Sequence, residues 1–310
     1  MNKIRAFFTL IRWPNLVFIA ITQVLFAYCI VMPVYYAIGQ TPIVKSITLF
    51  WLIFASVCIA AAGYIINDYF DLNIDRINKP DKVIVGNIIS RRWAIVFHLV
   101  LSVVGIVIGF YLDVSTRILL LSVANLICVL LLFAYSISLK KKLLIGNILI
   151  SLLTAWTVMV ITWCETRNLL SPLSVNRTKI TRYTFLYAGF AFIISLIREV
   201  IKDIEDIEGD RRYDCTTMPI LWGINASKIF ISVWLVVLIA LLISLQFYVL
   251  QFKWWLSAAY SILFIIAPLI NIFRGLFTAQ TSADYHKLSS RTKWVMLTGI
   301  LSMLFIRFYS

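Results

Sequence analysis

Two short segments of this sequence share one spacing of acidic residues, and each follows a long apolar stretch. Residues 67–76 read NDYFDLNIDR and residues 202–211 read KDIEDIEGDR. The common pattern is D-x-x-D-x-x-x-D-R, which puts three aspartates at i, i+3 and i+7 on one face of an α-helix. Because three like charges on one face repel one another, a neutralising partner is expected. A divalent cation fits, and Mg²⁺ with a phosphate-bearing substrate is the form that carboxylates commonly hold.

Acidic and basic residues are concentrated around these two segments. Eight of the fourteen Asp and Glu residues lie inside them. A single such motif could be a solvated helix end, but two with identical spacing indicate a shared site facing a cavity or an ion. Lysines and arginines stand nearby and suit a diphosphate bridged by Mg²⁺, although positive-inside topology alone would also account for them. They are Arg76, Lys79, Lys82, Lys140, Lys141, Lys142, Arg211 and Arg212.

The rest of the chain predicts membrane helices that position these segments. Of its 310 residues 62% are hydrophobic and 14% are charged, against about 25% charged in soluble domains. Apolar runs of about 20 residues predict an all-α integral membrane protein, one domain over 1–310, and exclude a β-barrel or a soluble core. Five dispersed cysteines and two histidines argue against zinc, haem or disulfides. The net charge of +14 is assigned to loops, anionic membrane lipids and phosphates, with no nucleic-acid partner.

Hydropathy predicts about nine spans and one orientation. With the N-terminus in the cytoplasm, 19 Lys and Arg residues fall on the cytoplasmic side and 8 on the other. Both acidic segments then lie on the cytoplasmic side of a cell inner membrane. Their separation of 135 residues suggests an internal duplication of a four-helix unit. The predicted spans are 15–37, 46–67, 94–112, 117–137, 143–163, 183–202, 228–251, 254–273 and 293–309.

Several motifs together resemble the UbiA-type intramembrane prenyltransferases. The first segment and the following Arg76-x-Asn78-Lys79-Pro80 are similar to that family's first signature, and Asp206-x-x-x-Asp210 is similar to the second. Three further short matches extend over nearly the whole chain. The resemblance implies nine transmembrane helices around a central cavity, two Asp-rich motifs on the cytoplasmic side, and Mg²⁺-dependent transfer of a prenyl group from a prenyl diphosphate donor. The three matches are Arg12-x-Pro14-Asn15, Gly146-Asn147 and Met218-Pro219-Ile220.

The same resemblance implies roles for individual residues. Lys82 departs from the family, which often has Arg-Pro at this point, so the path of its loop stays open. Arg198 and Glu199 are expected either to pair with each other or to line the cavity, and His98 to be a packed, hydrogen-bonded residue. The implied metal ligands are Asp68, Asp71, Asp75, Asp203, Asp206 and Asp210. The implied catalytic residues are Asp71, Lys140 and Asp206. The implied substrate contacts are Asn15, Asn67, Arg76, Lys82, Lys140 and Arg198.

The acceptor of the prenyl group is less strongly indicated. The segment from Arg198 to Asp210 and the pair Leu139-Lys140 are similar to the branch that makes archaeal-type ether lipids, which implies transfer of geranylgeranyl to geranylgeranylglyceryl phosphate. The alternative acceptor is an aromatic ring of quinone biosynthesis, namely 4-hydroxybenzoate, dihydroxynaphthoate or homogentisate. A membrane cation transporter is an alternative of another class, because paired carboxylates near a bilayer can also carry ions. Prenyl chain length and oligomeric state stay open.

Overall fold

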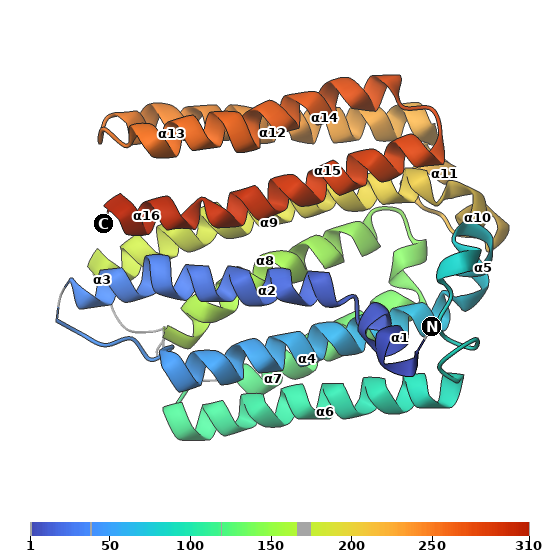
Figure 1. Cartoon of the computed structure of the whole chain (residues 1–310), viewed down its shortest axis with the longest axis horizontal. Helices are drawn as coiled ribbons and strands as arrows, with labels where there is room; N and C mark the ends of the chain where they lie inside the picture. Colours follow the sequence, from blue (N-terminus) through green and yellow to red (C-terminus); the bar gives the residue numbers. More distant parts are fainter. Residues whose placement is uncertain (1, 38, 119, 166–174, 310) are drawn as a thin grey trace.

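Long helices that run alongside one another make up the molecule (Figure 1). The computed structural model describes residues 2–37, 39–118, 120–165 and 175–309. Within these ranges the chain is helix and loop apart from one isolated bridge, so the predicted all-α class is confirmed. Seven helical stretches are long and apolar enough to cross a membrane. They are Trp13–Tyr36, Ser46–Phe70, Arg91–Thr116, Ile145–Glu165, Thr178–Glu205, Gly223–Leu250 and Trp255–Thr278.

Two of these stretches are built from three pieces each. In the first, α2 (Trp13–Phe26) passes through a π-helical turn, Ala27–Val31, into α3 (Met32–Tyr36). In the other, α13 (Trp255–Ser261) passes through Ile262–Ile266 into α14 (Ala267–Thr278). A proline stands at the start of the last piece in both cases, where its missing N–H interrupts the α-helical hydrogen bonds. The π-turn absorbs that interruption while the helix continues.

Two further predicted spans are helical but differ in length from the prediction. Residues 117–137 were expected to cross the membrane, and α7 (Leu121–Ile137) is shorter. The last span was expected to begin at 293, whereas α15 (Ser282–Leu301) begins eleven residues earlier and is followed by α16 (Met303–Tyr309). A capping box between Thr281 and Asp284 starts α15 inside a stretch that reads as a polar loop.

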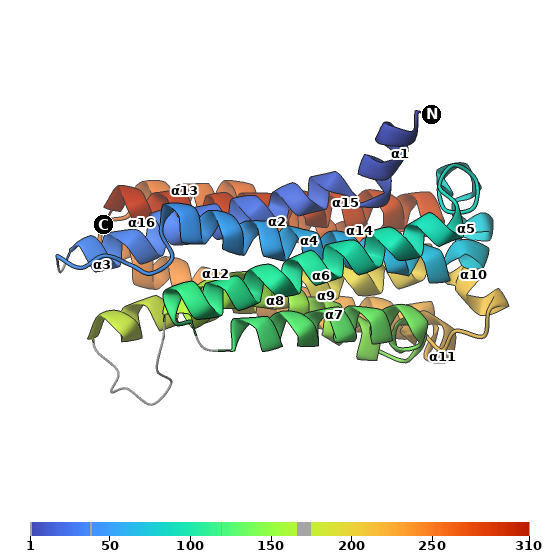
Figure 2. The same ribbon diagram turned by 90° about the horizontal axis from the view of Figure 1, so that it is seen from below.

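The remaining long helices are α4 (Ser46–Phe70), α6 (Arg91–Thr116), α8 (Ile145–Glu165), α9 (Val175–Glu205) and α12 (Gly223–Leu250). Helix α4 packs against α6 and α7, and α9 packs against α8 and α15. The short helices α1 (Lys3–Leu10), α5 (Leu72–Asn78) and α10 (Ile207–Arg212) lie together at one end of the bundle, and α11 (Met218–Leu221) follows α10 (Figures 1 and 2). The C-terminus lies at the opposite end from the N-terminus.

Each acidic segment is split between a long helix and a short one. Helix α4 ends at Phe70 and α9 ends at Glu205. Asp71 and Asp206 are the N-cap residues that precede α5 and α10. The helix on which the spacing of each segment was interpreted is thus interrupted at the central aspartate. In each segment an i to i−4 backbone hydrogen bond follows the central aspartate. It runs from Asp75 N to Asp71 O at 2.8 Å in the first segment and from Asp210 N to Asp206 O at 3.2 Å in the second. Both segments consequently keep their three carboxylates on one side, around equivalent bends.

Candidate active site

A cavity of about 750 Å³ runs along the inside of the bundle. Along α9 its lining extends from Tyr187 to Glu205, which corresponds to about 27 Å of helix. Apolar and aromatic side chains such as Trp156 and Phe190 line it away from the acidic segments. All six aspartates of the two segments lie at its other end. The cavity thus joins a charged end to a long apolar interior.

The first acidic segment is held by basic side chains from two other helices or loops. Arg12 donates to Asp68 at 2.7 Å from a left-handed backbone conformation at the start of α2 (φ 51°), which is unusual for a residue other than glycine. Lys140, from the short 3₁₀ turn Leu139–Lys141, donates to Asp71 at 2.5 Å and to Asn67 Oδ1 at 3.2 Å. Asn67 also donates to Asp71 at 2.7 Å. The central aspartate is therefore fixed from both sides.

The second acidic segment has equivalent partners. Lys79 Nζ lies 2.8 Å from Asp206 Oδ1, so the loop after the first segment supplies the counter-charge of the second. Asn147 donates to Asp203 at 2.8 Å from α8. In each segment the central aspartate pairs with a lysine, Asp71 with Lys140 and Asp206 with Lys79. The two halves of the site are built alike although their partners come from different parts of the chain.

Asn78 joins the two segments directly. Its side-chain oxygen accepts a hydrogen bond from Gly209 N at 2.9 Å, and its side-chain nitrogen donates to Asp206 O at 3.1 Å. Gly209 has no side chain, and a Cβ atom built there would lie 2.4 Å from Asn78 Oδ1. The close approach of α5 and α10 therefore requires glycine at this position.

The carboxylates at this end carry an excess of negative charge. Burial, followed by the nearby carboxylates of Asp71 and Asp68, raises the pKa of Asp75 to about 7. Burial, followed by Asp206 and Asp71, raises the pKa of Asp210 to about 7. These two aspartates have no lysine or arginine partner within salt-bridge distance among the described residues. A cation between the segments would relieve this repulsion.

The carboxylates of the two segments suit Mg²⁺, but they do not fill all of its coordination positions. All the side chains concerned present carboxylate oxygen, which is the hard ligand that Mg²⁺ prefers. Among the described residues, no three acidic, histidine or cysteine side chains are close enough to hold a metal ion by themselves. Mg²⁺ usually keeps several waters and binds through one or two carboxylates together with substrate phosphates. The two segments therefore fit a metal that binds together with a phosphorylated substrate.

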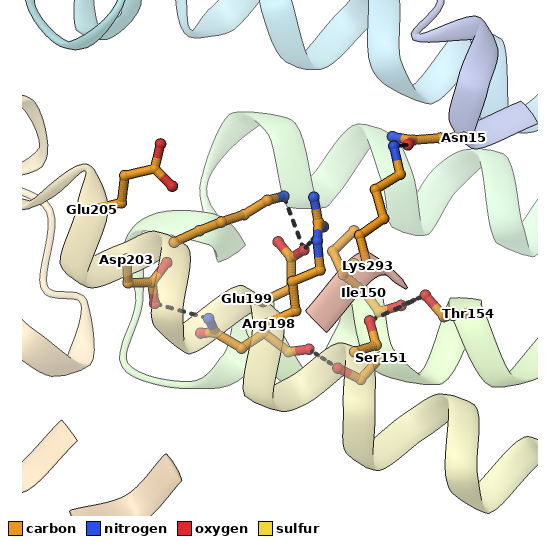
Figure 3. Close-up of polar contacts among 12 residues, drawn as sticks. Asn15, Ile150, Ser151, Thr154, Arg198, Glu199, Asp203, Glu205 and Lys293 are labelled. Carbon is orange, nitrogen blue, oxygen red and sulfur yellow. Dashed lines mark hydrogen bonds and ion pairs between the residues drawn. The ribbon is translucent and has the colours of Figure 1, made fainter. Parts of the chain in front are cut away.

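A second polar group lines the same cavity on α9 and α15. Arg198 and Lys202 both donate to Glu199 Oε1, at 3.0 and 2.9 Å. Lys293 donates to Asn15 Oδ1 at 2.7 Å. All five residues line the cavity, and Figure 3 shows Arg198, Glu199, Lys293 and Asn15. The sequence left two alternatives for Arg198 and Glu199, an ion pair or a position in the cavity lining. Both are present in the structure.

The other residues singled out in the sequence divide into those inside and those outside the cavity. Asn67, Lys140 and the six aspartates line it. Arg76 is exposed and does not line it, and the side chain of Lys82 lies outside the described part of the structure. His98 is buried and bonds to Ala62 O at 3.0 Å, as expected of a packed histidine.

The sequence assigned no role to Asn78, Asn147 or Lys293, and it marked Lys79 only as one of several basic residues that suit a diphosphate. Asn78, Lys79, Asn147 and Lys293 all bind a residue of the cavity lining. Asn78 and Lys79 stand in the Arg76-x-Asn78-Lys79-Pro80 match, and Asn147 stands in the Gly146-Asn147 match. Those matches were the available signal for three of the four. No comparable pattern marks Lys293.

Comparison with known proteins matches this architecture to one family. The profile of the UbiA prenyltransferase family matches residues 13–304. The chain belongs to that family. It is accordingly an integral membrane prenyltransferase, as the acidic segments predicted.

Relatives and solved structures agree with this assignment. The digeranylgeranylglyceryl phosphate synthase of Methanosphaera stadtmanae is 32% identical over 256 residues, covering 81% of this chain and 86% of that protein. The synthase of the same name from Thermococcus sibiricus is 33% identical over 192 residues, 62% of each chain. A UbiA homologue from Archaeoglobus fulgidus, solved with DMAPP and Mg²⁺, has a TM-score of 0.57 at 12% identity, covering 96% of this chain and 99% of that one. The UbiA homologue from Aeropyrum pernix K1 reaches 0.61 at 16% identity, covering 98% and 99%.

Proposed function

We propose that this protein transfers a geranylgeranyl group from geranylgeranyl diphosphate to geranylgeranylglyceryl phosphate with the help of Mg²⁺. The observation that carries the proposal is the meeting of two acidic segments, each with its own lysine, at the end of a long apolar cavity. A diphosphate needs cations at its head group, and an isoprenoid chain needs an apolar, water-poor space. This cavity offers both, and its lining spans about 27 Å of α9.

The reaction follows from these surroundings. The C1–O bond of the allylic diphosphate breaks and the diphosphate leaves with the bonding electrons. The acceptor hydroxyl oxygen forms a new bond to C1 and loses its proton, so the products are an ether, diphosphate and a proton. Bound Mg²⁺ would neutralise the negative charge that develops on the leaving group. Asp71, Asp75, Asp206 and Asp210 are proposed to hold it, with Asp68 and Asp203 beside them.

The chain's own side chains have defined tasks in this scheme. Lys79 and Lys140 stand beside the central aspartates and can donate to diphosphate oxygens as point charges. Aromatic side chains line the cavity next to the charged end, among them Tyr64 and Tyr135. Their ring faces can stabilise positive charge on the allylic carbon. The apolar walls keep water away from that carbon, so that the acceptor and not water captures it.

The choice of acceptor is supported by the relatives. Proteins named digeranylgeranylglyceryl phosphate synthase are 32% and 33% identical to this chain, and the first is matched over 86% of its length. A ring-alkylating enzyme is the alternative, with an aromatic acid such as 4-hydroxybenzoate as acceptor. The acceptor with a phosphate is favoured because the cavity contains basic residues that the acidic segments do not neutralise, namely Arg198 and Lys293.

The proposed arrangement in the membrane extends the seven long apolar helices to nine spans by adding α7 and the α15–α16 pair. The N-terminus and both acidic segments would face the cytoplasm of the inner membrane. Nineteen Lys and Arg residues on that side support this orientation. The four-helix duplication is kept as a proposal, supported by the matching bends at Asp71 and Asp206.

One experiment tests the reaction and its acceptor together. Purified protein is incubated with Mg²⁺ and geranylgeranyl diphosphate, and geranylgeranylglyceryl phosphate or one aromatic acid is supplied in separate reactions. We expect the diether phosphate as product by mass spectrometry. A product from an aromatic acid alone would overturn the acceptor. Metal uptake into proteoliposomes without any prenyl donor would instead support a cation transporter.

A further inference from the structure

The cavity contains a basic cluster that is separate from Lys79 and Lys140, the two lysines that pair with the central aspartates. It consists of Arg198, Lys202 and Lys293, with Glu199 as its one carboxylate among the described residues of the cluster. With three positive side chains and one negative side chain, the cluster has a formal charge of +2. Arg198 precedes Asp206 by eight residues, which places it about 12 Å further along the bundle.

The hydrogen bonds of this cluster leave donors without an acceptor. A single oxygen, Glu199 Oε1, accepts from both Arg198 and Lys202. Arg198 Nε is buried and has no hydrogen-bond partner. Lys293 bonds to the neutral side chain of Asn15 and lies 5.3 Å from the ring centre of Phe18, and no carboxylate pairs with it among the described residues. A buried N–H donor and an uncompensated positive charge are both costly in an apolar interior.

The cluster differs in this respect from the lysines at the acidic end. Lys79 and Lys140 each pair with the central aspartate of a segment, so their charges are compensated. The basic cluster has an excess of positive charge, and its arginine presents an unused donor. In Figure 3 the side chains of Arg198 and Lys293 both extend toward the part of the cavity where Asn15 lies. Such a group is built to receive an anion with several oxygen atoms.

We propose that Arg198, Lys202 and Lys293 form the subsite that binds the phosphate of the prenyl acceptor, with Asn15 orienting Lys293. The inference rests on the proposed function, because it requires a phosphorylated acceptor. A phosphate monoester carries a charge near −2 and three acceptor oxygens, which matches the +2 charge and the free donors of the cluster. The reacting hydroxyl of a glyceryl phosphate is only a few bonds from its phosphate. Anchoring the phosphate here therefore fixes the hydroxyl relative to the donor.

Acceptors with and without the phosphate test this subsite. Wild type and Lys293→Met are compared on geranylgeranylglyceryl phosphate and on geranylgeranylglycerol, each with saturating geranylgeranyl diphosphate and Mg²⁺. We expect Lys293→Met to raise the KM of the phosphorylated acceptor about ten- to hundredfold, as the loss of a hydrogen bond to a charged group does. The KM of the diphosphate donor should stay unchanged. On the acceptor without phosphate, the two proteins should have the same kcat/KM.

Two further variants control for charge and folding. Lys293→Arg keeps the charge and should restore most of the affinity for the phosphorylated acceptor. Arg198→Lys keeps the charge but removes the Nε–H group. It should therefore raise the KM of the phosphorylated acceptor and leave the KM of geranylgeranyl diphosphate unchanged. Lys228→Met removes a partly buried lysine that bonds to Ala279 O outside the cavity lining, and it should leave both KM values unchanged.

Several outcomes would overturn the inference. A rise in the donor KM or in the Mg²⁺ requirement of Lys293→Met would place this lysine at the diphosphate instead. An equal loss on both acceptors would show that the phosphate is not what Lys293 binds. If the wild-type protein forms product and the acceptor KM is unchanged in both Lys293→Met and Arg198→Lys, the subsite is refuted but the proposed function is not. No wild-type product from geranylgeranylglyceryl phosphate would refute the proposed function and, with it, the subsite.

Discussion

Replacement of Gly209 by alanine should disable the enzyme although alanine is the better helix residue. Gly209 lies in α10, and an added Cβ atom would come 2.4 Å from Asn78 Oδ1 and 2.5 Å from Asn78 Nδ2. To restore ordinary contact, Asn78 or α10 must move by about 1 Å. That movement breaks the two hydrogen bonds by which Asn78 connects the acidic segments, to Gly209 N and Asp206 O.

The magnitudes decide the direction of the effect. Alanine in place of glycine stabilises a helix interior by about 1 kcal/mol. The two lost hydrogen bonds contribute about 0.5–1.5 kcal/mol each, so their loss of about 1–3 kcal/mol offsets the gain. Stability should therefore change little or fall slightly. Catalysis is more sensitive, because a displacement of about 1 Å between reacting groups can reduce the rate about 100-fold. We expect kcat to fall by about that factor with a modest change in unfolding temperature.

The assay is steady-state prenyl transfer together with thermal unfolding in detergent, and a double-mutant cycle gives the control. In an Asn78→Ala background the clash partner is absent, so adding Gly209→Ala should cost far less than it does in wild type. Gly189→Ala is the matched control, since a Cβ atom there meets nothing within 4 Å. Wild-type kcat in Gly209→Ala would refute the reasoning. Strictly additive effects of the two substitutions would also refute it, because residues in direct contact, as Asn78 and Gly209 are here, should not act independently.

Three other changes probe separate parts of the structure. Lys140→Met removes a charged donor from Asp71 and Asn67, and kcat/KM for the diphosphate should fall about ten- to hundredfold. Removal of divalent metal with EDTA should abolish transfer, and added Mg²⁺ should restore it, because the two acidic segments repel a diphosphate when no cation lies between them. Glu165→Ala leaves the backbone N–H groups of Ile43 and Val44 without their carboxylate acceptor and should lower the free energy of unfolding by about 2–4 kcal/mol, measured by denaturant titration.

Each of these changes has a control and a result that contradicts it. Lys141→Met tests a neighbouring lysine and should have a smaller effect, since Lys141 has no aspartate partner among the described ion pairs; equal losses would remove the special role of Lys140. Transfer that persists in EDTA would exclude a metal requirement. Glu208→Ala removes an exposed i, i+4 pair and should leave stability unchanged, so a loss equal to that of Glu165→Ala would contradict the burial argument.

The sequence predicted that the two acidic segments face a shared cavity, and all six aspartates line one cavity in the structure. Aspartates are rare in an apolar chain, and three at i, i+3 and i+7 define a helix face wherever the helix is placed. Their partner Lys79 was visible only as a nearby basic residue, and the family resemblance marked Lys140 without showing which aspartate it pairs with. Which lysine pairs with which segment depends on how α5 approaches α10, and that is fixed by the contact between Asn78 and Gly209. A contact between residues 131 positions apart leaves no periodic signal.

Hydropathy likewise predicted the membrane helices only in part. Hydropathy located seven long spans, because burial in lipid requires about 20 apolar residues. It misplaced the start of α15, where Ser282 begins a helix within a polar stretch through a capping box. Lys293 lies on that helix, one face of which lines the cavity, so its charge faces inward and gives no hydrophobic pattern. Lys293 escaped detection in the sequence for this reason.

The distribution of charge along the cavity explains why one substrate would need a metal and the other would not. Outside the basic cluster, seven carboxylates and four lysine or arginine residues line the cavity, so the acidic end repels a diphosphate unless Mg²⁺ intervenes. The basic cluster has the opposite excess, with Arg198, Lys202 and Lys293 against Glu199. If the proposed subsite is correct, a phosphate monoester would bind there without a metal and would be repelled by the acidic end. Two phosphorylated lipids can then occupy one cavity in a fixed order, with the carbon to be transferred between them.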